Sequence, residues 1–168
     1  IQYLPLRHIM EPDYQHHEGF TRAQVELVAG RVSALNECFY WTTGHARFLR
    51  ESGRVNNLDY NLEALVNPDV ESGVAGGKEL LAFSDAVIGP DRATLDNARA
   101  ALAEALGAAA VPAAAAIAAT FSKNDRIANG CGIPADPLIL KLTKDFREQI
   151  GLNDFRSAVN TFKHFPGT

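Results

Sequence analysis

Helical spacing of apolar residues is the feature that most limits how this chain can fold. Thr21 begins a segment in which Val25, Val28 and Val32 recur every three or four residues, as on one face of a helix. Thr21 and Gln24 also stand at the spacing of a capping box, which marks a helix start. No stretch has the alternating pattern of a strand. The sequence therefore predicts an all-α fold of six or seven helices.

Glycine and proline divide the rest of the chain into further helical segments. Further helices are expected at about Cys38–Ser52, 57–67, Lys78–Val87, Thr94–Leu106, Val111–Asn129 and 136–150. Gly53 is expected to end the helix that begins at Cys38. The segment Val111–Asn129 is apolar almost all round, as expected of a buried central helix.

The length of 168 residues suits one domain, predicted to span residues 1–168. Residues 1–20 are expected to be an irregular lead-in. Residues 152–168 form a C-terminal tail whose apolar pattern fits packing against a partner subunit.

Composition argues against several classes of partner. The net charge is -4, and Lys and Arg are scattered, so no nucleic-acid partner is expected. The longest apolar stretch, Ala108–Ala119, contains Pro112 and is mostly alanine, so no membrane partner is expected either. The only two cysteines, Cys38 and Cys131, are far apart in sequence, which makes a reducing cytoplasm the default location.

The segment from Glu26 to His45 carries the strongest functional signal. Eleven residues separate Glu26 from Cys38, two separate Cys38 from Trp41, and three separate Trp41 from His45. This spacing resembles the motif of the carboxymuconolactone decarboxylase / alkylhydroperoxidase D-like family: Glu, eleven residues, Cys, two residues, Cys, three residues, His. Trp41 stands where that motif has its second cysteine. Flanking matches extend the resemblance over roughly residues 21–134.

The resemblance implies an alkylhydroperoxidase D-like helical bundle, a small-molecule substrate, no cofactor, and a homo-oligomer (dimer, trimer or hexamer). In the family, the downstream cysteine attacks peroxide and the upstream cysteine resolves the product. Trp41 removes the first of these roles. The carboxymuconolactone decarboxylase branch works without paired cysteines and tolerates Trp41 better.

Three residues are candidates for catalysis, and each has a structural alternative. His45 could be a general acid or base, or a core histidine. Glu26 could be a base or proton relay, or a surface carboxylate of its helix. Cys38 could be a residual nucleophile or redox thiol, or a small buried hydrophobe. If Cys38 and His45 share one helix, they lie about 10 Å apart along its axis, with Trp41 between them on the same face.

That geometry makes a direct Cys38–His45 ion pair unfavourable, and a disulfide within the motif is impossible. Cys131 could act as a distant disulfide partner or be an ordinary cysteine. Pocket residues are expected at Trp41, Tyr40, Thr42 and His17, although plain packing also explains them. His16 and His17 are adjacent, but nothing else has metal-ligand spacing, so no metal is predicted.

The sequence therefore favours an enzyme that performs cofactor-free acid/base chemistry, such as decarboxylation or isomerisation, on a small carbonyl or carboxylate compound. The first alternative is an alkyl hydroperoxidase-like antioxidant protein with a degenerate Cys-x-x-Cys motif. The second is a non-catalytic ligand-binding or scaffold homologue.

Overall fold

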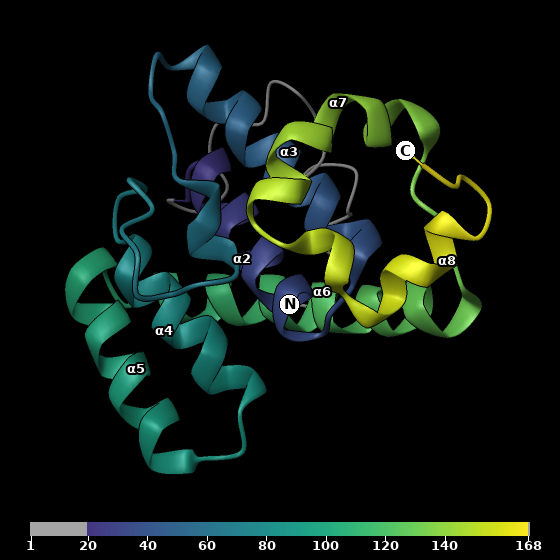
Figure 1. Cartoon of the computed structure of the whole chain (residues 1–168). Coiled ribbons are helices and arrows are strands. Elements are labelled where there is room, and N and C mark those ends of the chain that lie inside the picture. The colour runs from purple at the N-terminus through teal and green to yellow at the C-terminus, as the bar shows by residue number, and fades with distance from the viewer. Residues whose placement is uncertain (1–19, 168) are drawn as a thin grey trace.

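Helix α2 (Arg22–Leu35) lies at the centre of the computed structural model, which describes residues 20–167. Helices α3 (Phe39–Val55), α4 (Gly77–Ile88) and α6 (Ala110–Cys131) pack around it (Figure 1). Every residue from Ala23 to Ala34 is buried. The described residues are all-helical, which confirms the predicted fold class.

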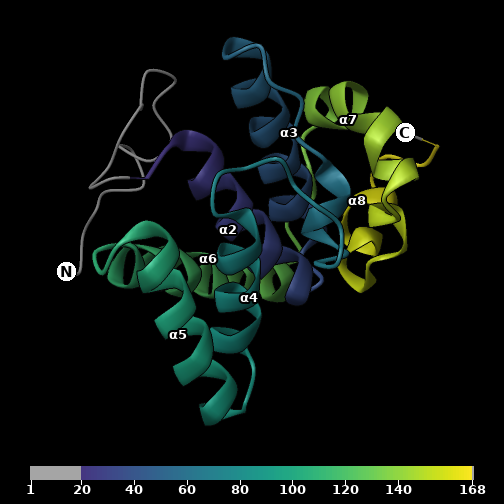
Figure 2. The same ribbon diagram turned by 90° about the vertical axis from the view of Figure 1, so that its left-hand side faces the viewer.

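The remaining elements pack on either side of this centre. Figure 2 shows the α4–α5 hairpin on one side and α7 with α8 on the other side of α3. These elements are α5 (Arg92–Leu106), α7 (Pro137–Gln149), α8 (Val159–Phe162) and the 3-10 helices η1 (Leu62–Leu65), η2 (Leu152–Asp154) and η3 (Arg156–Ala158). Seven α-helices within residues 20–167 agree with the expected six or seven. The specific alkylhydroperoxidase D-like arrangement stays a prediction.

The joint between α2 and α3 places the motif residues. Thr21 and Gln24 form the predicted capping box at the start of α2. After Asn36 ends α2, Glu37 adopts a left-handed conformation with φ 47°. Cys38 is then the residue that caps the N-terminus of α3. This tight turn sets α3 back along α2, so Glu26 and His45 can face each other.

The helix predicted over Val111–Asn129 is present as α6, but the prediction that it is the buried central helix was wrong. Only 8 of the 22 residues of α6 are buried, and Ile127 is 51% exposed. Helix α2, expected to bury one face, is buried all round. Its polar side chains find partners, as when Arg31 pairs with Asp85 and Gln24 donates to the Ala75 carbonyl oxygen. Apolar pattern alone underestimates burial of such a helix because paired polar groups can be buried too.

Two predicted helix boundaries in the middle of the chain were also wrong. Helix α3 continues through Gly53 to Val55. A Cβ at Gly53 would lie 2.6 Å from the Leu58 carbonyl oxygen, so glycine is needed there for a close backbone approach and not for helix termination. The helix expected over 57–67 is reduced to the single turn η1, because Asn57 takes a left-handed φ of 55°.

The C-terminal tail packs on this chain's own α3. The Phe162 ring lies 5.3 Å from the Phe39 ring, centroid to centroid. Ser157 Oγ accepts a hydrogen bond from the Phe39 backbone N–H and donates one to the Glu37 carbonyl oxygen. These contacts bring the tail against the start of α3, where the sequence suggested a partner subunit.

Candidate functional site

Glu26 and His45 form a buried hydrogen-bonding contact between α2 and α3. His45 Nδ1 lies 2.6 Å from Glu26 Oε2. The side chains are 1% and 0% exposed, so this contact is shielded from water. A neutral imidazole that donates from Nδ1 to the carboxylate keeps its lone pair on Nε2. The two catalytic candidates from α2 and α3 therefore meet, as their motif spacing suggested.

Arg22 and two aromatic rings fix this pair in place. Arg22 Nε lies 2.5 Å from Glu26 Oε1, so the two side chains form an ion pair. Among the described residues, no donor meets that oxygen in hydrogen-bonding geometry. The Trp41 ring stacks on the imidazole at 5.6 Å and 20°. The Phe121 ring, from α6, meets it edge-on at 4.2 Å. The imidazole is thus held on two sides and at one nitrogen.

His45 Nε2 is buried and has no hydrogen-bond partner among the residues that the structure describes. An unpaired buried nitrogen costs free energy, and such atoms are rare in folded proteins. Thr42 Oγ1 and Asn124 Nδ2 are also buried without partners. Trp41 and Arg22 are only partly buried, so they are the side chains around His45 that meet solvent.

Cys38 lies in a second buried cluster, centred on Asp125 of α6. Ser33 Oγ donates to Asp125 Oδ1 at 2.8 Å, and Asn36 Nδ2 donates to Oδ2 at 3.0 Å. The Cys38 thiol lies close enough to this carboxylate for Asp125 to raise the pKa of the thiol. Cys38 is 0% exposed and Asp125 is 0% exposed. The thiol is therefore enclosed beside a buried carboxylate.

Burial raises the pKa of the Cys38 thiol to about 12, and the neighbouring Asp125 carboxylate adds to this rise. The backbone N–H groups of Tyr40 and Trp41 lower the pKa, as expected at a helix N-terminus, but less strongly. Burial likewise raises the pKa of Asp125 above its ordinary value of 3.8. A thiol in this state is a poor nucleophile at neutral pH. The geometry favours the structural interpretation of Cys38.

The other sequence candidates have mixed outcomes. Tyr40 packs edge-on against Trp41 at 5.1 Å. Thr42 is buried one turn before His45. His17 and His16 lie outside the described residues. Cys38 is free and buried, whereas Cys131 is free and exposed, so the disulfide between them that the sequence left open does not form.

Sequence reasoning missed Arg22, Phe121 and Asp125. Arg22 and Glu26 stand at i and i+4 on one helix, a spacing at which opposite charges pair, so this signal was present. Asp125 is an acidic residue four positions after Phe121 in a mostly apolar segment, which also marks a buried polar group. Nothing in the sequence alone shows that both face α3.

Within residues 20–167, no group of three or more His, Cys, Asp or Glu side chains could hold a metal ion. No helix in that range is long and apolar enough to cross a bilayer. Comparisons with protein-family models, with curated proteins and with solved structures found no match to this chain.

Proposed function

We propose that Glu26 and His45 act as a proton-transfer couple in cofactor-free acid/base chemistry on a small carbonyl or carboxylate compound. The observation that carries this proposal is the buried, unpartnered Nε2 of a histidine whose Nδ1 is held by a carboxylate. Such a carboxylate fixes the ring orientation and the tautomer, and it stabilises the imidazolium formed when Nε2 accepts a proton. The resemblance to the carboxymuconolactone decarboxylase branch supports the same class of chemistry.

An isomerisation catalysed by Glu26 and His45 moves one proton and conserves the electrons of the substrate. Nε2 takes a proton from a carbon next to a carbonyl, and the electron pair of that C–H bond moves into the enolate. The imidazolium then returns the proton to another carbon of the conjugated system, so no oxidant or reductant is consumed. The rings of Trp41 and Phe121 line the imidazole and would exclude water from the proton transfer.

The thiol peroxidase alternative has less support. It needs a reactive thiolate, whereas burial and Asp125 raise the pKa of Cys38 to about 12. It also needs the downstream motif cysteine, which attacks peroxide in the family, and Trp41 takes that place in the motif.

A first experiment tests the couple without knowing the substrate. Two-bond ¹⁵N correlation spectra of the histidine rings should show His45 with its proton on Nδ1 and a lone pair on Nε2. Glu26→Gln should disturb this tautomer. The exposed His164 provides the internal control because it has no carboxylate partner within residues 20–167. A His45 ring protonated on Nε2 alone would contradict the proposed base.

A second experiment measures turnover. Unsaturated lactone carboxylates and β-keto acids are incubated with the protein in D2O, and deuterium incorporation or loss of CO2 is followed by proton NMR. His45→Gln should slow turnover by a factor on the order of 100, and Glu26→Gln by about 10. His164→Gln is the matched control and should leave the rate unchanged. Activity that survives His45→Gln would contradict the proposal, as would peroxide turnover abolished by Cys38→Ser. No turnover across the panel would favour a scaffold role.

A further inference from the structure

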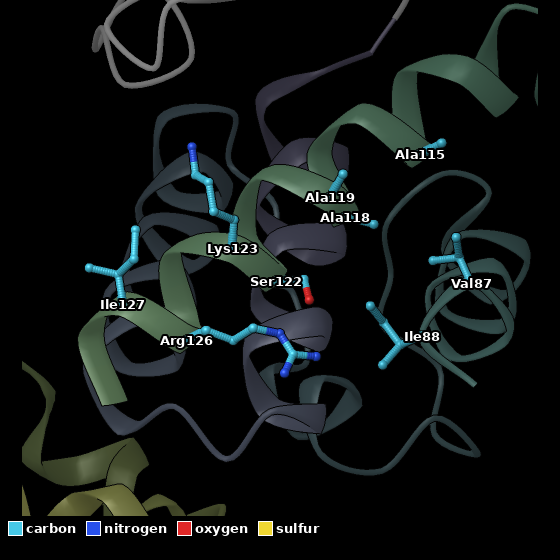
Figure 3. A pocket seen from close by; sticks show the side chains of 9 residues that line it. All are labelled: Val87, Ile88, Ala115, Ala118, Ala119, Ser122, Lys123, Arg126 and Ile127. Atoms are coloured by element: carbon cyan, nitrogen blue, oxygen red, sulfur yellow. The ribbon is translucent and has the colours of Figure 1, made fainter. Parts of the chain in front are cut away.

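A groove of about 560 Å³ lies between the end of α4 and the outer side of α6 (Figure 3). Val87 and Ile88 line it from α4, and Ala115, Ala119 and Ser122 line it from α6. Ser122 is one residue beyond Phe121 on α6, so it faces about 100° away from the His45 cluster. The groove is therefore separate from the proposed proton-transfer couple.

The groove has the size and lining of a small-molecule site. Pockets for small ligands usually enclose about 300–1,000 Å³, with apolar walls and a few polar groups that fix the ligand's orientation. Here valine, isoleucine and alanine side chains make the walls. The polar groups are Ser122, Lys123 and Arg126, which come from consecutive turns at one end of the groove.

Arg126 is the charged group best placed to meet a ligand. Figure 3 shows its guanidinium pointing across toward Ile88, with the Ser122 hydroxyl facing the same space. Ser122 and Arg126 are four residues apart, which puts them on one face of α6. Neither side chain makes an ion pair or hydrogen bond with a described residue. Most described arginines do form ion pairs, namely Arg22, Arg31, Arg50, Arg54, Arg92, Arg99 and Arg156.

Charge and shape together select the kind of ligand. Lys123 at the rim also lacks a carboxylate partner among the described residues, so this end of the groove is positive in a chain whose net charge is -4. The other end, around Ala115 and Ala119, is apolar. Ala115 and Arg126 are eleven positions apart on one helix, which corresponds to about 16 Å. A ligand that fits has an anionic head and an apolar chain of medium length.

We propose that this groove binds the anion of a medium-chain fatty acid. Its carboxylate pairs with the Arg126 guanidinium and accepts a hydrogen bond from Ser122, since a guanidinium can donate two parallel hydrogen bonds to a carboxylate. Its alkyl chain lies over Ala119 and Ala115 and against Val87 and Ile88. Burial of that chain supplies the affinity, and Arg126 supplies the preference for an anion.

Isothermal titration calorimetry on the full chain tests this with sodium octanoate and 1-octanol, which differ in the charged head. Octanoate should bind about tenfold more tightly than octanol, because only octanoate pairs with Arg126. Arg126→Gln should remove this preference by weakening octanoate alone. Arg54→Gln, which changes an exposed arginine of α3, is the matched control and should bind like the unchanged protein. Equal affinity for the two ligands, or unchanged octanoate affinity in Arg126→Gln, would overturn the proposal.

A second variant locates the ligand and tests the competing occupant, a second copy of this chain. Ala119→Trp places a large ring in the groove from an exposed position and should abolish binding of both ligands, while circular dichroism shows the helices intact. Amide shifts on adding octanoate should concentrate at Val87, Ile88 and residues 115–126. Shifts elsewhere would overturn the proposal. The proposal would also be overturned if Ala119→Trp changed the oligomeric mass and the unchanged protein did not bind octanoate.

Discussion

Glu26 and Asp125 are both fully buried carboxylates, and each lies beside a titratable side chain: Glu26 beside His45 of α3, and Asp125 beside Cys38 at the N-cap of α3. They differ in how their surroundings are satisfied. Both oxygens of Asp125 accept hydrogen bonds, from Ser33 and Asn36, and the carboxylate raises the pKa of the Cys38 thiol. Glu26 holds one nitrogen of His45 and leaves the other without a partner. The comparison shows that burial beside a carboxylate raises the pKa of a thiol and lowers its reactivity. The same burial can leave one nitrogen of an imidazole without a partner and able to accept a proton.

The largest effect is expected when Glu26 is removed. Glu26→Ala removes the carboxylate that pairs with Arg22 and leaves His45 Nδ1 without its acceptor in a buried site. Breaking one side of a buried pair costs about 3 kcal/mol in the free energy of unfolding. Urea denaturation measures this loss. Glu104→Ala, at an exposed position of α5, should stay within about 0.5 kcal/mol of the unchanged protein. Equal losses in the two variants would contradict a buried pair.

The next effect concerns Gly30 of α2, which lies against Leu65 of η1 and His45 of α3. A Cβ there would lie 2.9 Å from Leu65 Cδ2 and 3.3 Å from His45 Cβ. Gly30→Ala should therefore destabilise the protein by about 2 kcal/mol through overpacking. It should also shift the ring resonances of His45 while leaving the amide of Ser33 little changed.

Gly44 offers the matched control because a Cβ there meets nothing within 4 Å. It lies inside α3, so Gly44→Ala should stabilise the protein by about 0.5–1 kcal/mol. Thermal unfolding measures both variants: Gly30→Ala should lower the midpoint temperature and Gly44→Ala should raise it. A stabilising Gly30→Ala would mean that Leu65 moves aside without cost.

Asp125 should give the closed cluster a distinct pH dependence. Burial raises its pKa in the folded protein above the ordinary value of 3.8, so the folded state holds its proton more tightly than the unfolded state. This contribution to stability is fully present below pH 3.8 and is lost as the pH rises through the raised pKa.

Asp125→Asn removes that titration. The difference in unfolding free energy between the variant and the unchanged protein should therefore change over the window that begins near pH 3.8 and extends upward through the raised pKa. Denaturation with urea at several pH values measures this difference. A difference that is flat across the window would contradict a raised pKa at Asp125.

The sequence predicted the arrangement of residues on α2 and α3 better than their surroundings. The resemblance to a family motif predicted that Glu26, Trp41 and His45 belong together, and helix periodicity placed Trp41 and His45 on one face of α3. The sequence could not show that Phe121 and Asp125 approach from α6, since that depends on how separate helices pack. Burial of α2 was underestimated for a related reason: its polar residues looked solvent-facing until their partners on other helices were in place.

The sequence left two interpretations of Cys38 open, and two opposing effects on the pKa of its thiol decide between them. A cysteine at a helix N-terminus is expected to have a lowered pKa, and the backbone N–H groups of Tyr40 and Trp41 do act in that direction. Desolvation is the larger effect and raises the pKa, and Asp125 acts with it. The sequence places Cys38 near a helix N-terminus but does not show how deeply its thiol is buried. It therefore indicated the lowering of the pKa by backbone N–H groups, which is the weaker effect, and not the rise caused by desolvation.

The smallest perturbation is chemical labelling, which sharpens the contrast between the two cysteines. At pH 8 a thiol whose pKa is raised from 9.0 to about 12 carries roughly a thousandfold less thiolate, and Cys38 is also buried. Cys131 is exposed at the end of α6. A disulfide reagent should therefore label one thiol per native chain and two in guanidinium, and Cys131→Ser should abolish the native label. Rapid native labelling of Cys131→Ser would show that Cys38 is accessible as a thiolate, which would restore the redox interpretation of the motif.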